Sequence, residues 1–452
     1  MNLFLPSDPR PVHFVGIAGA GMSALAMLAL RRGVRVTGSD RAPEGAPDLP
    51  GLGAVVVAGA APDLVREARA VVVSAAIAAD HPELQRARAL GVPVVTRKRA
   101  LADLVAGQVT VAIAGTHGKT TTTVMTTEVL AAAGLNPTGL AGGRVAAWGG
   151  NARIGSDHLF VVEADEYDQA FLELQPTVAV VNNVEPEHLE CYGGSVDAME
   201  AAFVRFASGA RRVLVGTDDP GADRVAERLA PAVWRFGPGA GDVALEAMSL
   251  GPDGCSAMVR FPDGRRVPLR LPVPGMHNLR NATAAMGVAC ALEADVTAGA
   301  AALARFGGVG RRFERVGERD GITVVDDYAH HPTELAATLA AARQAYPGRR
   351  VVAVFQPHLY SRTAVQGTAM GEALRAADLA LVTEVYAARE APVPGVTGAT
   401  VARAAGNATF VADRSALLDR LAAEVRPGDV VLTLGAGDIT ALGPMLLARL
   451  GQ

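Results

Sequence analysis

The chain has 452 residues, of which 50% are apolar and 4% aromatic, and its formal net charge is −4. Domains commonly contain roughly 100–150 residues, so this length predicts two to four of them. The near-neutral charge gives no reason to expect nucleic acid or an anionic membrane as a partner. No apolar run approaches the ~20 residues that a bilayer-spanning helix needs.

The cysteines and the N-terminus indicate the compartment. The three cysteines, Cys191, Cys255 and Cys290, have neither a metal-ligand spacing nor the pattern of a disulfide framework. The first residues, MNLFLPSDPR, lack the basic start and apolar stretch of a signal peptide. We therefore expect a cytoplasmic protein without membrane insertion, either a monomer or a homodimer.

Apolar, β-branched runs alternate with helical segments in the first part of the chain. These runs are VHFVGIAG, VRVTGSD, AVVVAG, AVVVSAAI and VPVVT. Strands that alternate with helices predict a parallel sheet built from strand–helix–strand crossovers. Two further blocks of this kind follow, the second starting at VTVAIAG and the third at ITVVDD.

The rhythm of the second block breaks over residues 243–274. Two turn dipeptides, Asp253-Gly254 and Asp263-Gly264, separate alternating segments there and predict a small antiparallel patch. We place domain boundaries near residues 105 and 312. The expected fold is α/β, with three mostly parallel sheets in domains 1–105 (Rossmann-like), 106–312 (P-loop ATPase-like, carrying the patch) and 313–452 (Rossmann-like).

The second block opens with a shortened phosphate-binding loop. The strand VTVAIA runs directly into GTHGKTTTT, and a helix is expected to start there. The common phosphate loop has its first glycine five residues before the second, whereas here Gly115 stands three residues before Gly118. The backbone amides of this loop and the positive end of the helix predict an anion site. The residues concerned are Gly115, Thr116, His117, Gly118, Lys119, Thr120 and Thr121.

Lysine is rare in this chain. Only Lys98 and Lys119 occur among the 42 lysines and arginines, and one of them stands in the loop. A compact charge on a flexible stem suits the β- and γ-phosphates of a nucleotide, and the hydroxyl of Thr120 suits Mg²⁺. We expect ATP and Mg²⁺ here.

Two polar segments follow strands of the same block. They are EADEYD (163–168) and NNVEPEH (182–188). Ligand sites of α/β proteins form where strands end, so one of these carboxylates is expected to complete a Mg²⁺ site with Thr120. His188 is a candidate ligand of a second metal, although a single histidine is as often structural.

The N-terminal block carries a glycine-rich turn, GIAGAGMSALA (16–26). Its glycines, Gly16, Gly19 and Gly21, differ in order from the common dinucleotide pattern. Asp40 ends the next strand, at the position that reads a ribose in dinucleotide-binding folds. This predicts a diphosphate site, with a plain strand-to-helix turn as the alternative.

The third block places basic side chains after strands. They lie in DDYAHHPTE (326–334) and QPHLYSR (356–362). The cluster, which predicts carboxylate recognition, comprises His330, His331, His358 and Arg362.

Together these segments resemble the Mur ligase family, and motifs from residue 16 to 362 carry the resemblance, including GMHNLRN and GRRFE. The resemblance implies ATP-dependent ligation of L-alanine to the lactyl carboxylate of UDP-N-acetylmuramate. It implies UDP-sugar contacts at Gly16, Gly19, Gly21, Met22, Ser23, Asp40 and Ser74. It also implies metal ligands Thr120, Glu163 and His188, nucleotide contacts at Asn281 (near His277 and Asn278) and Arg312, and an alanine site at His330 and Arg362. The catalytic residues so implied are Lys119, His330 and Arg362.

The chain departs from the family pattern at two positions. Leu359 stands where some relatives have arginine, which leaves more of the alanine carboxylate to Arg362. Glu187 stands where aspartate is frequent. The carbamylated lysine of sibling ligases has no counterpart, because no lysine other than Lys119 follows residue 98.

Three alternatives remain at this point. A sibling ligase would add another amino acid or a peptide. An NAD-dependent oxidoreductase would use the Gly16–Gly21 turn and Asp40, but would leave the phosphate loop unexplained. A nucleotide-regulated binding protein would bind ATP without turnover.

Overall fold

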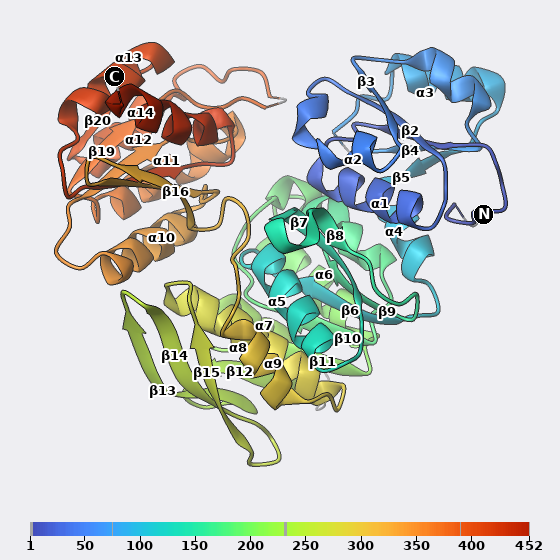
Figure 1. Ribbon diagram of the computed structural model, residues 1–452, viewed down its shortest axis with the longest axis horizontal. Helices are drawn as coiled ribbons and strands as arrows, with labels where there is room; N and C mark the ends of the chain where they lie inside the picture. The colour runs from blue at the N-terminus through green and yellow to red at the C-terminus, as the bar shows by residue number, and fades with distance from the viewer. Residues whose placement is uncertain (1–2, 75, 230–232, 389, 452) are drawn as a thin grey trace. The chain divides into compact units, whose positions relative to one another are not determined.

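The computed structural model describes residues 3–74, 76–229, 233–388 and 390–451. Its strands form three sheets flanked by helices, so the α/β class is confirmed (Figure 1). The chain divides into two compact units. The first comprises Met1–Ala247, Ala257–Leu269 and Arg280–Arg305, and the second comprises Met248–Ser256, Arg270–Leu279 and Phe306–Gln452.

The first sheet has five parallel strands in the order β3-β2-β1-β4-β5. They are β1 (Val12–Val15), β2 (Val36–Asp40), β3 (Val55–Ala58), β4 (Ala70–Val73) and β5 (Val94–Thr96). Both faces of the central strands are buried, because Phe14 and Val72 join one hydrophobic core whereas Val15 and Val71 join another. This two-sided burial is the reason that the strands read as continuous apolar runs.

The second sheet has ten strands in the order β15-β14-β13-β12-β11-β10-β6-β9-β7-β8. Those nearest the phosphate loop are β6 (Val109–Ala114), β7 (Thr138–Val145), β8 (Gly150–Arg153), β9 (Leu159–Glu163), β10 (Val178–Val181) and β11 (Arg212–Gly216). Strand β6 pairs in parallel with both β10 and β9. The loop that follows β6 therefore starts at the same edge of the sheet as the polar segments that follow its two neighbours.

The expected patch is present at the end of this sheet. It consists of β13 (Val243–Gly251), β14 (Gly254–Arg260) and β15 (Arg266–Leu271), preceded by β12 (Val233–Pro238). The turns fall at the predicted dipeptides, where Gly254 and Gly264 have φ of +104° and +83°. Only glycine adopts such angles readily.

The third sheet has the order β16-β17-β21-β18-β19-β20. Its strands are β16 (Glu314–Arg319), β17 (Ile322–Asp327), β18 (Val351–Phe355), β19 (Leu379–Val382), β20 (Ala408–Phe410) and β21 (Val430–Leu434). Alternate residues of β18 enter separate cores, Ala353 and Phe355 on one face and Val352 and Val354 on the other. Helices therefore cover both faces, as a parallel sheet requires.

The helices begin at identifiable caps. Asp219, Asp295 and Asp413 each accept a backbone hydrogen bond at the start of a helix. The α-helices of the structure are α1 (Ala20–Arg31), α2 (Asp48–Gly51), α3 (Pro82–Leu90), α4 (Arg97–Val105), α5 (Lys119–Ala132), α6 (Val196–Ser208), α7 (Pro220–Glu227), α8 (Met276–Ala291), α9 (Val296–Leu303), α10 (Pro332–Ala345), α11 (Tyr360–Leu374), α12 (Gly398–Ala405), α13 (Arg414–Glu424) and α14 (Leu442–Leu450).

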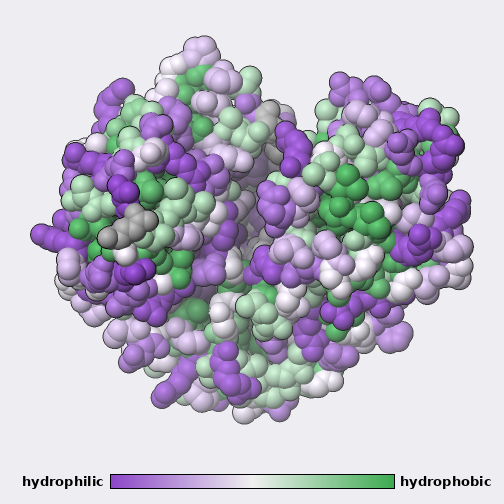
Figure 2. Space-filling model, turned by 45° about the horizontal axis from the view of Figure 1, so that its top comes forward, coloured by the Kyte–Doolittle hydropathy of each residue, from purple (hydrophilic) through white to green (hydrophobic). Residues whose placement is uncertain are grey.

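Within the described ranges, no helix combines the length and apolarity that crossing a membrane requires. Figure 2 shows hydrophilic residues over much of the face drawn, with smaller hydrophobic patches among them.

Candidate active site

The phosphate loop lies between β6 and α5, as predicted. Gly115 and Gly118 have φ of +134° and +79°. A Cβ on Gly115 would lie 2.9 Å from Asn182 Cβ, and one on Gly118 would lie 2.6 Å from Asn281 Oδ1. Glycine is required at both positions by conformation and by space.

Two asparagines that follow β10 hold this loop. The amides of Thr116 and His117 donate to the backbone and side-chain oxygens of Asn183, at 3.1 and 2.7 Å. Asn182 Nδ2 donates to Thr122 Oγ1 at 3.0 Å. Two of the amides expected to face an anion are therefore occupied by protein acceptors.

The remaining amides stand at the start of α5. Those of Gly118, Lys119, Thr120 and Thr121 donate to no acceptor within the described part of the chain. Four such donors and the positive end of a 14-residue helix suit a phosphate group. Of the amides predicted from the sequence to face an anion, those of Gly118 to Thr121 are therefore free to bind one, whereas those of Thr116 and His117 are not.

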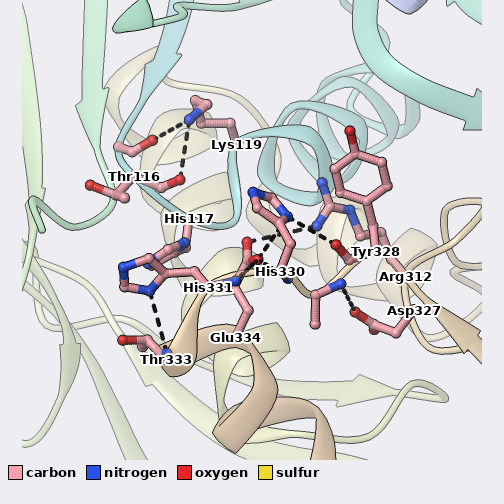
Figure 3. Close-up of polar contacts among 12 residues, drawn as sticks. Thr116, His117, Lys119, Arg312, Asp327, Tyr328, His330, His331, Thr333 and Glu334 are labelled. Carbon is pink, nitrogen blue, oxygen red and sulfur yellow. Dashed lines mark hydrogen bonds and ion pairs between the residues drawn. The ribbon is translucent and has the colours of Figure 1, made fainter. Parts of the chain in front are cut away.

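Lys119 lies folded against its own loop. Its Nζ donates to the carbonyl oxygens of Gly115 and Thr116, at 2.7 and 3.2 Å (Figure 3). It also donates to Glu166 Oε1 at 2.9 Å. Burial alone would lower the pKa of Lys119, but the neighbouring carboxylates, Glu166 foremost, outweigh it and raise that pKa. The amine is therefore held in its charged form.

Asn281 is brought to the loop from α8. The side chain of Asn281 is buried, and its Oδ1 accepts a hydrogen bond from Thr122 Oγ1 at 3.2 Å. Asn278 is used differently, since its Nδ2 donates to the carbonyl oxygen of Pro274 at 2.7 Å near the helix start.

The acidic segment follows β9. Glu163 is the last residue of that strand and stands opposite Ile113 of β6, and its carboxylate accepts the amide of Gly142. Thr120 is buried, and its hydroxyl forms no hydrogen bond with the residues described. A hydroxyl, a carboxylate and free amides at one sheet edge fit a magnesium–phosphate group, because Mg²⁺ takes few protein ligands.

His188 follows β10 in a left-handed conformation, with φ of +54°. Its ring meets that of Tyr167 edge to face, with centroids 5.0 Å apart, and Nδ1 lies 3.5 Å from Glu190 Oε1. His188 thus contacts Tyr167 of the acidic segment and Glu190 just after its own segment, and its metal role remains a prediction.

The glycine-rich turn connects β1 and α1 and is fastened by Asp40. Asp40 Oδ2 accepts the amide of Ala18 at 2.9 Å, and Oδ1 accepts that of Ala42 at 3.0 Å. In this structure Asp40 shapes the turn. Its predicted contact with a ribose is not tested by these bonds.

Other residues assigned to the sugar nucleotide differ in exposure. Ser74 Cβ lies 3.5 Å from the position of a Cβ on Gly16, so Ser74 borders the turn. The side chain of Met22 is buried in the core at 1% exposure, and Ser23 Oγ donates to the carbonyl oxygen of Ala20 at 3.0 Å. Gly19 accepts the amides of Met22 and Ser23, closing the first turn of α1.

The second unit assembles most of the predicted basic cluster. His330 Nδ1 donates to the carbonyl oxygen of Tyr328 at 3.0 Å, and the rings of His330 and His358 are 6.1 Å apart. Arg362 is buried, and its Nη1 lies 3.3 Å from His358 Nδ1. Leu359 precedes α11 with φ of +69°.

His331 serves as a helix cap. Its Nδ1 accepts the amide of Thr333 at 3.3 Å, while Glu334 accepts the amide of His331, forming a capping box at the start of α10 (Figure 3). Arg312 stacks on the ring of Tyr328, 4.9 Å from its centroid, and its Nη1 lies 4.0 Å from Glu334 Oε1.

Asp327 was not predicted individually from the sequence. This carboxylate is buried and accepts the amides of Phe313 and Ala329, at 2.7 and 2.8 Å. Burial raises the pKa of Asp327 to about 6, against the opposing effect of Arg312. The pair Asp326-Asp327 at the end of an apolar strand was the signal that could have identified it.

A glycine loop with free amides at a helix start, in the middle of a mostly parallel sheet and next to carboxylates, is typical of a nucleotide-dependent enzyme. Comparison with known proteins assigns it further. Three descriptions match in chain order: "Mur ligase family, catalytic domain" over residues 11–108, "Mur ligase middle domain" over 113–289 and "Mur ligase, glutamate ligase domain" over 311–437. The chain belongs to the Mur ligase family of ATP-dependent ligases.

Several relatives are similar over nearly their whole length. A UDP-N-acetylmuramate–L-alanine ligase of Renibacterium salmoninarum is 45% identical, with 98% of this chain and 97% of the relative covered. A protein with the same description from Thermobifida fusca is 43% identical, and the match covers 100% of both chains. Another from Kineococcus radiotolerans is 47% identical, and the match covers 98% of this chain and 96% of the relative. Family membership across the chain leaves no support for the oxidoreductase alternative.

Solved structures agree with this assignment. A UDP-N-acetylmuramate–alanine ligase of Thermotoga maritima superposes with a TM-score of 0.84 at 31% identity, covering 97% of this chain and 99% of that one. A murein peptide ligase of Psychrobacter arcticus reaches 0.75 at 24% identity, covering 98% and 99%, and shares the fold.

Proposed function

We propose that this chain joins L-alanine to the lactyl carboxylate of UDP-N-acetylmuramate while ATP is converted to ADP and phosphate, a step of peptidoglycan precursor synthesis. The observation that carries this proposal is identity of 43–47% over nearly the whole chain to ligases of that description. The phosphate loop, with its lysine and four free amides, supplies the chemistry that such a ligase needs.

The reaction must first activate a carboxylate. A carboxylate is a poor acylating agent because oxide is a poor leaving group. Attack of a lactyl carboxylate oxygen on the γ-phosphorus of ATP forms an acyl phosphate and releases ADP. The amine of alanine then attacks the acyl carbon, and the tetrahedral intermediate collapses to the amide and inorganic phosphate.

The phosphate loop would stabilise the first step. Lys119 would leave the carbonyl oxygens of Gly115 and Thr116 and place its charge on the transferring phosphoryl group. The free amides at the start of α5 would bind phosphate oxygens. Thr120 and Glu163 would hold Mg²⁺, which would neutralise negative charge on the phosphates, and His188 is proposed for a second metal.

The second unit would receive alanine. The buried guanidinium of Arg362 suits a carboxylate. Because a carbonyl oxygen can only accept, Nδ1 of His330 is the donor in its hydrogen bond with Tyr328. In the neutral form of the ring, Nε2 would then carry the lone pair. That nitrogen can orient the alanine ammonium group or accept its proton.

Phosphate release tests the proposal. The enzyme is incubated with ATP, Mg²⁺ and UDP-N-acetylmuramate, and each common amino acid is added in turn. L-alanine is expected to give the fastest release, with weaker release for glycine and serine, since a small pocket discriminates poorly against them. Faster release with another amino acid or a peptide would identify a sibling ligase, and binding of ATP without any release would identify a binding protein.

A further inference from the structure

Arg97 covers the first turn of α1. It is the first residue of α4, which begins after β5 with Thr96 as its cap. A Cβ on Gly21 would lie 2.8 Å from Arg97 Nη1 and 3.3 Å from Cζ. The guanidinium group therefore lies directly against the backbone of Gly21, where only the absence of a side chain leaves room for it.

The helix end beneath this guanidinium group is itself positive. The amides of Ala20 and Gly21 donate to no acceptor among the residues described, and the first turn of α1 has no acidic residue. A cation beside a helix N-terminus is electrostatically unfavourable, whereas an anion there is stabilised. Two free amides and a guanidinium group at one point have the composition of an anion site.

The protein partner of Arg97 does not remove its charge from this point. Arg97 Nη2 lies 3.4 Å from Asp165 Oδ2, and the two side chains are 26% and 38% exposed. A pair so long and so exposed contributes about 0–1 kcal/mol. Asp165 Oδ1 also accepts the amide of Tyr167 at 3.1 Å, so the carboxylate is fixed and can orient the guanidinium group.

We propose that Arg97 binds the diphosphate of the sugar nucleotide, with Nη1 directed to the anion and Asp165 positioning the group through Nη2. This inference rests on the proposed function, which supplies UDP-N-acetylmuramate as the ligand. A guanidinium group forms short, charge-assisted hydrogen bonds with phosphate oxygens in a fixed geometry. Arg97 is thereby a substrate-binding residue of the glycine-rich turn, contributed by the segment that leads out of the first sheet.

The neighbouring Lys98 provides a matched control. Lys98 Nζ lies 2.9 Å from Asp168 Oδ2, with side chains 27% and 56% exposed. Both cations therefore link the start of α4 to the same acidic segment, but Lys98 is directed to Asp168 while Arg97 lies on Gly21. Loss of a structural link would be shared by variants at both positions, and loss of a diphosphate contact would not.

The test compares Arg97→Met, Arg97→Lys and Lys98→Ala with the wild type. Methionine keeps an unbranched stem over Gly21 without charge. For Arg97→Met, we expect the Kd of UDP-N-acetylmuramate, by calorimetry, and its KM to rise about 30-fold, as truncation of a charged hydrogen bond implies. Lysine should restore part of the loss, and Lys98→Ala should stay within about twofold. The KM of ATP should change less than about threefold in each variant.

Two results would overturn the inference while leaving the proposed function intact. One is a wild-type Kd for UDP-N-acetylmuramate in Arg97→Met. The other is an equal loss in Arg97→Met and Lys98→Ala, which would assign Arg97 to the structural link. A wild-type enzyme that neither binds nor turns over the sugar nucleotide would instead refute the proposed function and the inference with it.

Discussion

Lys119 Nζ lies 2.8 Å from Glu166 Oε2, so the lysine of the phosphate loop is paired with a carboxylate from the segment that follows β9. Glu166 is 3% exposed, and burial raises the pKa of its carboxyl group while Lys119 opposes that rise. The hydroxyl of Tyr192 donates to the backbone oxygen of Glu166 at 2.6 Å and fixes its place. The ammonium group of Lys119, which we propose binds the phosphates, is thus paired with the buried carboxylate of Glu166.

Replacing Glu166 with glutamine should lower the stability of the first unit. The substitution keeps the shape of the side chain and leaves the charge of Lys119 without its counter-ion. We expect the free energy of unfolding to fall by about 1–3 kcal/mol. The loss is smaller than for a fully buried pair, because the side chain of Lys119 is 17% exposed. Urea unfolding in the absence of nucleotide measures this loss of stability. The control, Asp168→Asn, breaks the exposed pair with Lys98 and should cost less than about 1 kcal/mol. Equal losses would contradict the account.

Replacing Lys119 with alanine should lower kcat for phosphate release by about 10³-fold or more, because stabilisation of the transferring phosphoryl group is mainly electrostatic. The Kd of UDP-N-acetylmuramate should stay near its wild-type value. Lys98→Ala, the change at the only other lysine, should keep most of the activity. A Lys119→Ala enzyme with a kcat within tenfold of the wild type would rule out this role.

Replacing Arg362 with lysine should raise the KM of L-alanine by about 10-fold or more and leave that of ATP within about threefold. Lysine keeps the charge but loses the planar fork that matches a carboxylate. Steady-state phosphate release with alanine varied measures the change. Arg403→Lys, on an exposed position of α12, is the control. A rise confined to the KM of L-alanine supports the assignment. An unchanged KM of L-alanine, or an equal or larger rise in the KM of ATP, would reject it.

Asp327 should make stability depend on pH. The pKa of Asp327 is about 6 in the folded protein, whereas that of an ordinary aspartate is 3.8. Between about pH 4 and 6, the folded state therefore holds a proton that the unfolded state has released. The contribution of Asp327 to the free energy of unfolding therefore falls by up to about 3 kcal/mol as pH rises through that window. Above the window the contribution is constant.

The variant Asp327→Asn isolates this effect. Asparagine cannot titrate. Between pH 4 and pH 7, the free energy of unfolding of the Asp327→Asn protein should therefore fall less than that of the wild type. The comparison uses the difference between the two pH values, because asparagine also replaces an acceptor of the Phe313 and Ala329 amides. Parallel pH profiles for the two proteins would show that Asp327 is ionised throughout.

Buried parallel strands could be predicted because both of their faces are apolar. Strand β18, VVAVF, is an example, with all five residues buried. Strand β7, TGLAGGRV, was not predicted, because its glycines interrupt the apolar pattern. Strand β16, ERVGER, was missed because it is an exposed edge strand that pairs only with β17.

The site could be predicted as motifs and less well as individual partners. The loop, its lysine and the acidic segment were identified from their places after strands. Which carboxylate approaches Lys119 depends on the backbone of the acidic segment, where Asp168 and Gln169 have φ of +52° and +50°. Local sequence does not determine such a path, and the contact between Arg97 and Gly21 joins residues that no spacing rule relates.

In the proposed reaction, the γ-phosphoryl group of ATP passes to the lactyl carboxylate. Mass spectrometry of the phosphate released in one turnover tests it most directly, using UDP-N-acetylmuramate labelled with ¹⁸O in that carboxylate, together with ATP, Mg²⁺ and L-alanine. We expect one ¹⁸O atom in each inorganic phosphate, because the bridging oxygen leaves with phosphorus when the amide forms. Unlabelled phosphate would contradict it.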